Sequence, residues 1–152
     1  MTNKYKPQIP SIVEELRSAK ENFELLTIQD TTANTEWLKN NFPIASAGRI
    51  NWEKVPESLC IKYFGDSELF SAFEKIVAQQ QLEGNLNLIV SWGNALTLAI
   101  QIDMEVLRKY AESIFQQDWE TWICDEQNEW LIENHHDGEI CFGKCMIGNK
   151  KK

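Results

Sequence analysis

The chain has 152 residues, and its 23 acidic and 15 basic side chains give it a formal net charge of −8. A hydrophobic content of 43%, with six Trp, seven Phe and three Tyr, excludes a disordered chain and is typical of one domain, here residues 1–152 with flexible ends at about 1–8 and 146–152. The apolar runs are far shorter than the roughly 20 residues that cross a bilayer, and no apolar stretch follows the first lysines, so we expect a cytoplasmic protein with neither a signal peptide nor a membrane partner.

Helices are predicted at three places in the first half of the chain. A capping box and apolar residues at helical spacing predict the first helix over residues 11–25. A threonine cap and a terminating proline predict the second over residues 35–42, followed by a mostly irregular segment over 44–58. A β-prone run over residues 59–64 then precedes a third helix over 66–80.

The second half is predicted to consist mainly of strands. Alternating apolar residues predict strands over 86–92 and 96–102, joined as a hairpin by the two-residue loop Gly93-Asn94. Asp103 can cap a helix that extends to about Gln117.

Three more strands are predicted over residues 121–125, 129–135 and 139–143, joined by short polar turns that favour antiparallel pairing. The predicted fold is therefore α+β, with a mostly antiparallel sheet of about five to six strands and helices packed on one face. The other face would be partly open to solvent or to a partner.

The four cysteines do not form a dense framework, and the chain is long enough to build its own core. We therefore expect thiols rather than disulfides. Cys60 and Cys124 are interpreted as small core residues.

Candidates for catalysis or metal binding are few. His135 and His136 are flanked by acidic residues, but neighbouring strand residues point to opposite faces, so the two rings are not expected to converge. Cys141 and Cys145 could join one histidine in a zinc site, although a second cysteine pair is missing. Since the standard catalytic motifs are also absent from the sequence, we expect no enzyme, no metal and no cofactor.

Negative charge is concentrated in one part of the sequence. Residues 110–143 contain nine Asp or Glu and no Lys or Arg. This charge disfavours direct binding of nucleic acid and favours a basic protein partner. The tryptophans within it, Trp119, Trp122 and Trp130, are either core residues or aromatic anchors of a binding surface that faces Arg or Lys.

The segment D-W-E-T-W-I-C followed by W-L-I-E-N-H-H-D-G-E-I-C-F-G, residues 118–143, resembles the C-terminal region of small bacterial immunity proteins. These proteins protect cells from polymorphic toxins, including those of contact-dependent growth inhibition. A looser similarity covers residues 51–63. The resemblance implies stoichiometric binding of a cognate toxin domain, often a nuclease with a basic groove, whose active site is covered or distorted.

The family offers no fixed residue set to transfer, so candidate contacts come from charge and aromaticity. The partner-binding candidates are Trp119, Glu120, Asp125, Glu126, Glu129, Glu133, Asp137 and Glu139. Strand alternation requires some of them to face inward. An acidic adaptor that binds a basic protein without inhibiting it, and a small metalloprotein using His and Cys, are the alternatives, and the sequence does not indicate an oligomeric state.

Overall fold

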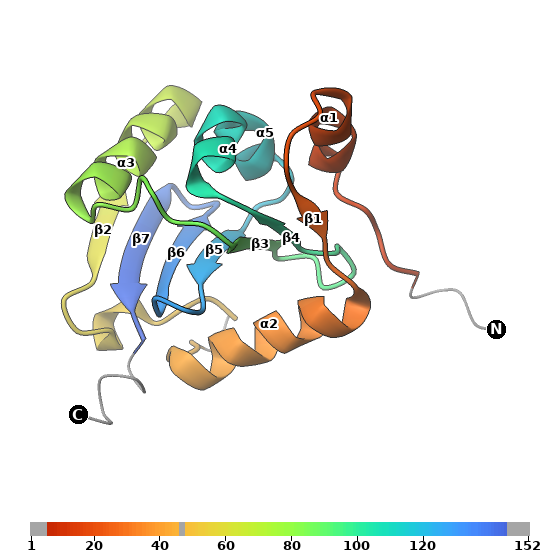
Figure 1. Ribbon diagram of the computed structural model, residues 1–152. Helices are drawn as coiled ribbons and strands as arrows, with labels where there is room; N and C mark the ends of the chain where they lie inside the picture. Colours follow the sequence, from red (N-terminus) through yellow and green to blue (C-terminus); the bar gives the residue numbers. More distant parts are fainter. Residues whose placement is uncertain (1–5, 46–47, 146–152) are drawn as a thin grey trace.

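The computed structural model describes residues 6–45 and 48–145, and an antiparallel sheet runs through its middle in the order β1-β4-β3-β5-β6-β7-β2 (Figure 1). The strands are β1 (Glu24–Leu25), β2 (Leu59–Lys62), β3 (Leu88–Trp92), β4 (Ile100–Ile102), β5 (Thr121–Asp125), β6 (Trp130–His135) and β7 (Glu139–Lys144). The helices are α1 (Ile12–Ser18), α2 (Ile28–Asn41), α3 (Gly65–Gln79), α4 (Met104–Lys109) and α5 (Ala111–Gln116), with a 3-10 turn η1 (Trp52–Lys54). The predicted α+β class with an antiparallel sheet is confirmed.

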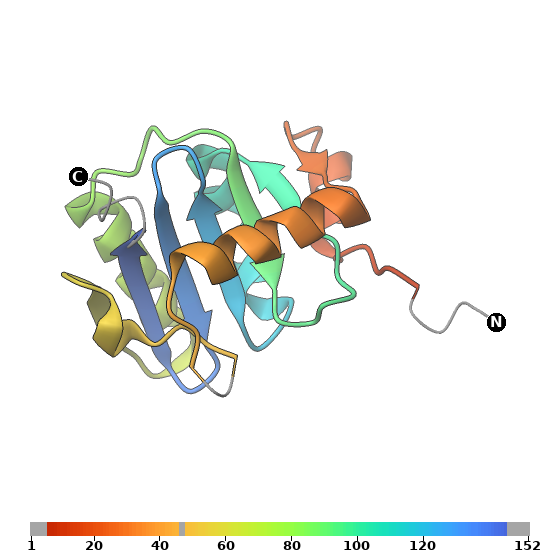
Figure 2. The same ribbon diagram turned by 90° about the horizontal axis from the view of Figure 1, so that it is seen from below.

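Helices cover both faces of the sheet. α1, α3, α4 and α5 pack on one face, as predicted, whereas α2 crosses the opposite face (Figures 1 and 2). The face that was predicted to be partly open to solvent or to a partner is therefore largely covered, because Leu38 of α2 and Trp52 of η1 pack on it.

The larger core lies under the four helices. One cross-strand row, Val90, Ile123, Ile132 and Phe142, follows the register from β3 through β5 and β6 to β7. These side chains are at most 3% exposed. Burial of each side chain stabilises the folded state by about 1.5–3 kcal/mol. The alternation of apolar residues within these strands therefore determines which face of the sheet the helices cover.

The smaller core lies under α2 and η1. It contains Cys124 and Leu131, which pair in the β5–β6 register. Gly143 allows the close approach of η1, because a Cβ there would lie 2.7 Å from the Trp52 indole and 2.7 Å from Val55.

Helix boundaries differ from the prediction. α1 ends at Ser18 instead of continuing to residue 25, since Lys20 adopts a positive φ of 58°. α2 begins well before residue 35, because the Thr27 hydroxyl caps it by accepting a hydrogen bond from the Asp30 amide at 3.0 Å. The helix predicted over 103–117 is divided at Tyr110 into α4 and α5.

The predicted hairpin across Gly93-Asn94 is wrong in its register. β3 pairs Leu88 with Ile102 and Val90 with Ile100, so residues 93–99 form a longer connection. The Asn94 side chain accepts from the Leu96 amide at 2.9 Å and turns the chain away from β3. The Leu98 amide then bonds to the Gln8 carbonyl at 2.9 Å.

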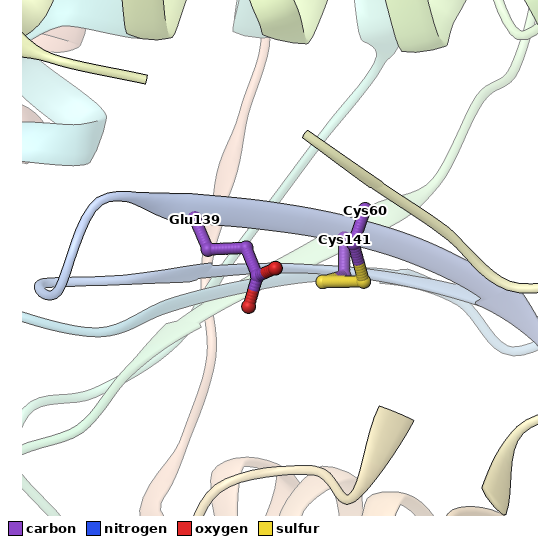
Figure 3. A group of neighbouring side chains, drawn as sticks. All are labelled: Cys60, Glu139 and Cys141. Atoms are coloured by element: carbon purple, nitrogen blue, oxygen red, sulfur yellow. A yellow bond between two sulfur atoms is a disulfide. The ribbon is translucent and has the colours of Figure 1, made fainter. Parts of the chain in front are cut away.

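The expectation that all four cysteines are thiols is wrong for two of them. Cys60 of β2 and Cys141 of β7 form a disulfide (Figure 3). They are direct partners in the antiparallel register, with Cα atoms 4.1 Å apart, although 81 positions separate them in the sequence. Cys60 is exposed and is therefore not the core residue expected; Cys124, which is 1% exposed, is one.

Both predicted flexible ends fall largely on residues 1–5 and 146–152, which lie outside the described residues. Gln8 forms a parallel bridge with Thr97. Among the helices that the structure describes, none is long and apolar enough to cross a membrane.

Candidate partner-binding surface

The eight candidate residues do not form one surface, because β5 and β6 place them at opposite ends of the sheet. We call the end where β5 turns into β6, residues 125–129, the β5–β6 end. The β6–β7 end comprises residues 118–120 before β5, the turn 136–138, and Glu139 at the start of β7. The five residues of β5 separate the two ends by roughly 14 Å.

At the β5–β6 end, two of the three acidic residues hold the fold together. Asp125 is 2% exposed and accepts hydrogen bonds from the amides of Gln127 at 3.1 Å and Asn128 at 2.9 Å. Glu126 accepts from the Asn34 side chain of α2 at 2.8 Å. Only Glu129 is exposed among them, so this end offers a partner little free negative charge.

Glu133 lies beneath α2 and η1, on the face of the sheet that α2 crosses. It is 1% exposed and accepts hydrogen bonds from the indoles of Trp52 at 2.7 Å and Trp122 at 2.8 Å, and from the Ile50 amide at 3.1 Å. The Arg49 Nε lies 4.0 Å away. Because a buried carboxylate needs such donors, Glu133 is a structural anchor for residues 49–52 and is unavailable to a partner.

The other four candidates lie together at the β6–β7 end. Trp119 is 70% exposed and stacks on the His136 ring with centroids 4.9 Å apart. Its neighbour Glu120 contacts His136 Nδ1 at 2.8 Å, and Asp137 and Glu139 follow in the β6–β7 turn and β7. An exposed indole therefore lies at the same end of the sheet as three carboxylates.

Arg49 reaches this end from the segment before η1. Its guanidinium bonds to Asp137 at 3.0 Å and to Glu139 at 3.4 Å. Burial alone would raise the pKa of Asp137, but the His135 ring and Arg49 outweigh it and hold the pKa below its ordinary value. The carboxylate thus stays ionised, and Arg49 cancels only part of the local negative charge.

The expectation that His135 and His136 diverge is wrong. β6 ends at His135, so His136 lies in the turn rather than on the alternating strand, and the two rings stack with centroids 4.4 Å apart. Both face the Glu120 carboxylate. The Asp137-Gly138 turn signal, which begins one residue later, could have indicated that strand alternation stops at His135.

Phe64 is a surface residue that the sequence reasoning missed. It is 87% exposed, and the amide of the preceding Tyr63 bonds to the Gly138 carbonyl at 2.9 Å, which places Phe64 beside the β6–β7 turn. Only the pairing of β2 with β7 brings it there, so no local pattern could have found it.

The cysteines give no sign of a reactive nucleophile. Cys145 and Cys124 are buried free thiols, and burial raises the pKa of Cys145 to about 12 and that of Cys124 further. Cys141 is joined to Cys60, so the zinc site expected as an alternative from Cys141 and Cys145 does not form.

The comparisons with known proteins agree with a binding role. The family model described as CdiI immunity protein EcoliA0-like matches residues 11–143, which covers every helix and strand except the last residue of β7. No match is found among the curated proteins.

Proposed function

Because the chain belongs to the EcoliA0-like family of CdiI immunity proteins, we propose that it neutralises one cognate toxin domain by stoichiometric binding through the β6–β7 end. We further propose that the toxin is a nuclease whose basic substrate groove receives the acidic rim of this end. Binding there would exclude the nucleic acid from the groove.

The observation that carries the proposal is the setting of Trp119. An indole that is 70% exposed is costly to leave in water, and large exposed aromatics surrounded by polar groups are typical hot spots of protein interfaces. Glu120 and Asp137 lie close to it through the histidine pair. The site thus combines an apolar anchor with charges that complement Arg and Lys.

Phe64 supports a broader contact. β5, β6, β7 and β2 are consecutive in the sheet, so three inter-strand spacings, roughly 14 Å, separate the strand next to Trp119 from the strand next to Phe64. Two exposed aromatics at this separation fit within one side of a standard interface of about 800 Å² per partner. The β6–β7 turn, with Asp137, lies between them.

The first test is co-purification of the tagged protein from its native cell, identification of the bound chain, and a nuclease assay of that chain with and without this protein. We expect inhibition that is complete at equimolar concentration. Association should slow as ionic strength rises, because opposite charges steer the encounter. A partner that remains active in the complex would favour the adaptor alternative instead.

Variants then test the surface with the purified toxin domain. Trp119→Ala and Phe64→Ala should each weaken binding at least tenfold, as expected for aromatic anchors. Leu86→Ala is the matched control, since Leu86 is 62% exposed but lies two residues before β3, near the β5–β6 end. Equal effects of all three variants, or none from Trp119→Ala, would place the toxin elsewhere on the molecule.

A further inference from the structure

We propose that Glu120, His135 and His136 form a zinc site at the β6–β7 end. The inference does not depend on the identity of the toxin, because it rests on ligand chemistry within this chain alone. It assigns a role to the only two histidines of the sequence, which the proposed binding function leaves unexplained.

The ligand atoms are close enough for one ion. Glu120 Oε2 lies 2.8 Å from His136 Nδ1 and 3.6 Å from His135 Nε2, and one ligand atom from each residue lies within 4.8 Å of the others. Tetrahedral zinc with bonds of about 2.0–2.1 Å places its ligands roughly 3.4 Å apart. The two distances to Glu120 differ from this value by about 0.6 Å or less, and the separation of the two ring nitrogens by at most about 1.4 Å, so side-chain adjustments of that size would surround the ion.

The surroundings of His135 support metal binding more than a simple stack of rings. Its Nε2 faces Glu120, and its Nδ1 lies 3.0 Å from Asp137 Oδ1. Both ring nitrogens thus face a carboxylate oxygen, and the Asp137 amide also lies 3.3 Å from Nδ1. With the Nδ1 proton directed to Asp137 Oδ1, Nε2 is left free to bind a metal. A carboxylate that receives the second N–H of a metal-bound histidine is a recurrent support in zinc sites.

The fold holds these residues in place from three directions. Arg49 bonds to the other oxygen of Asp137 at 3.0 Å and so orients the carboxylate that faces His135. Gly93 leaves room for Glu120, because a Cβ there would lie 2.7 Å from Glu120 Oε1. Trp119 packs against the His136 ring.

Two imidazoles and one carboxylate favour zinc over calcium or magnesium, which prefer oxygen ligands only. Three protein ligands leave a fourth position for water or for a side chain of the bound partner. The position is accessible, since the His136 side chain is 47% exposed.

A second cluster, Cys60, Glu139 and Cys141, also brings three potential ligands together (Figure 3). In the structure its two sulfur atoms are bonded to each other. A disulfide supplies no thiolate, so this cluster is not proposed as a second site.

The test is calorimetric titration of the full chain, without a polyhistidine tag, with Zn²⁺ alone at neutral pH. We expect near-equimolar binding. Asp137→Asn should weaken it about 10–100-fold, as loss of a supporting carboxylate does in zinc sites. Glu120→Gln and His136→Gln remove ligands and should weaken it more. Circular dichroism of each variant without zinc checks that it is folded.

Glu129→Gln is the matched control, because it removes an exposed carboxylate at the β5–β6 end, remote from the proposed ligands and from Arg49. Its zinc affinity should equal that of the wild type. With Co²⁺ in place of zinc, the spectrum should show d–d bands without sulfur charge transfer. An absence of binding, binding that survives Glu120→Gln and His136→Gln, or a sulfur band would overturn the proposal.

Discussion

Replacing Glu133 with glutamine should destabilise the protein far more than an exposed substitution would. One Glu133 oxygen accepts the Trp52 indole N–H, and the other accepts the Trp122 indole and the Ile50 amide. Glutamine offers a single acceptor oxygen. Whichever way its amide is turned, at least one of these donors faces an NH₂ group instead of an acceptor.

The cost follows from the burial of the site. Hydrogen bonds to a charged group contribute about 1.5–3 kcal/mol, and a buried donor left without a partner costs about 1–3 kcal/mol. We expect Glu133→Gln to lower the free energy of unfolding by about 2–4 kcal/mol. For a chain of this length that corresponds to a fall in Tm of about 4–16 °C.

Urea unfolding followed by far-UV circular dichroism measures the change, with Glu129→Gln as the control because Glu129 is exposed near the start of the same strand. The control should stay within about 0.5 kcal/mol of the wild type. A double-mutant cycle with Trp52→Phe should give a coupling of at least about 1 kcal/mol. A loss below 0.5 kcal/mol for Glu133→Gln, or no coupling, would refute the view that this carboxylate anchors η1.

Two further substitutions test the packing of η1 on the sheet and the stability of the protein at acid pH. Gly143→Ala should lower the free energy of unfolding by about 1–3 kcal/mol in the same urea assay, because the added methyl group would overlap the Trp52 indole. An unchanged stability would mean that η1 can move away from the sheet. The Lys109 ammonium and the Tyr110 hydroxyl hydrogen-bond to Glu21 and lower its pKa. The ionised Glu21 therefore contributes to the free energy of unfolding above its ordinary pKa, and this contribution is lost as pH falls through the lower pKa of the folded state. Glu21→Gln should therefore flatten the acid side of the stability profile, and an identical pH dependence in both proteins would contradict this.

The sequence predicted the strands that have strong local signals. β5, β6 and β7 alternate in polarity and are joined by short polar turns, and their residue ranges agree closely with the structure. The position of α2 was not predictable in this way. Its contact with the sheet depends on single residues, such as Asn34 bonding to Glu126, that are distant in the sequence.

The candidate surface was predictable in composition but not in geometry. Counting acidic residues indicated residues 110–143 as the source of candidate contacts. An antiparallel strand, however, places its two ends at opposite ends of the sheet, which separates Glu129 from Asp137. Phe64 and Arg49 come from segments with no acidic excess. They reach the β6–β7 end only through strand pairing and ion pairs between residues that are more than 70 positions apart in the sequence.

The disulfide between Cys60 and Cys141 has a topological consequence. It closes residues 60–141 into a covalent ring that contains α3 and strands β3 to β6, whereas α1, β1 and α2 belong to a tail outside the ring. If this tail detaches from the sheet, the ring still keeps Trp119, the histidine pair and Asp137 on one closed loop. Opening of the N-terminal third and loss of the β6–β7 end are thereby made separate events.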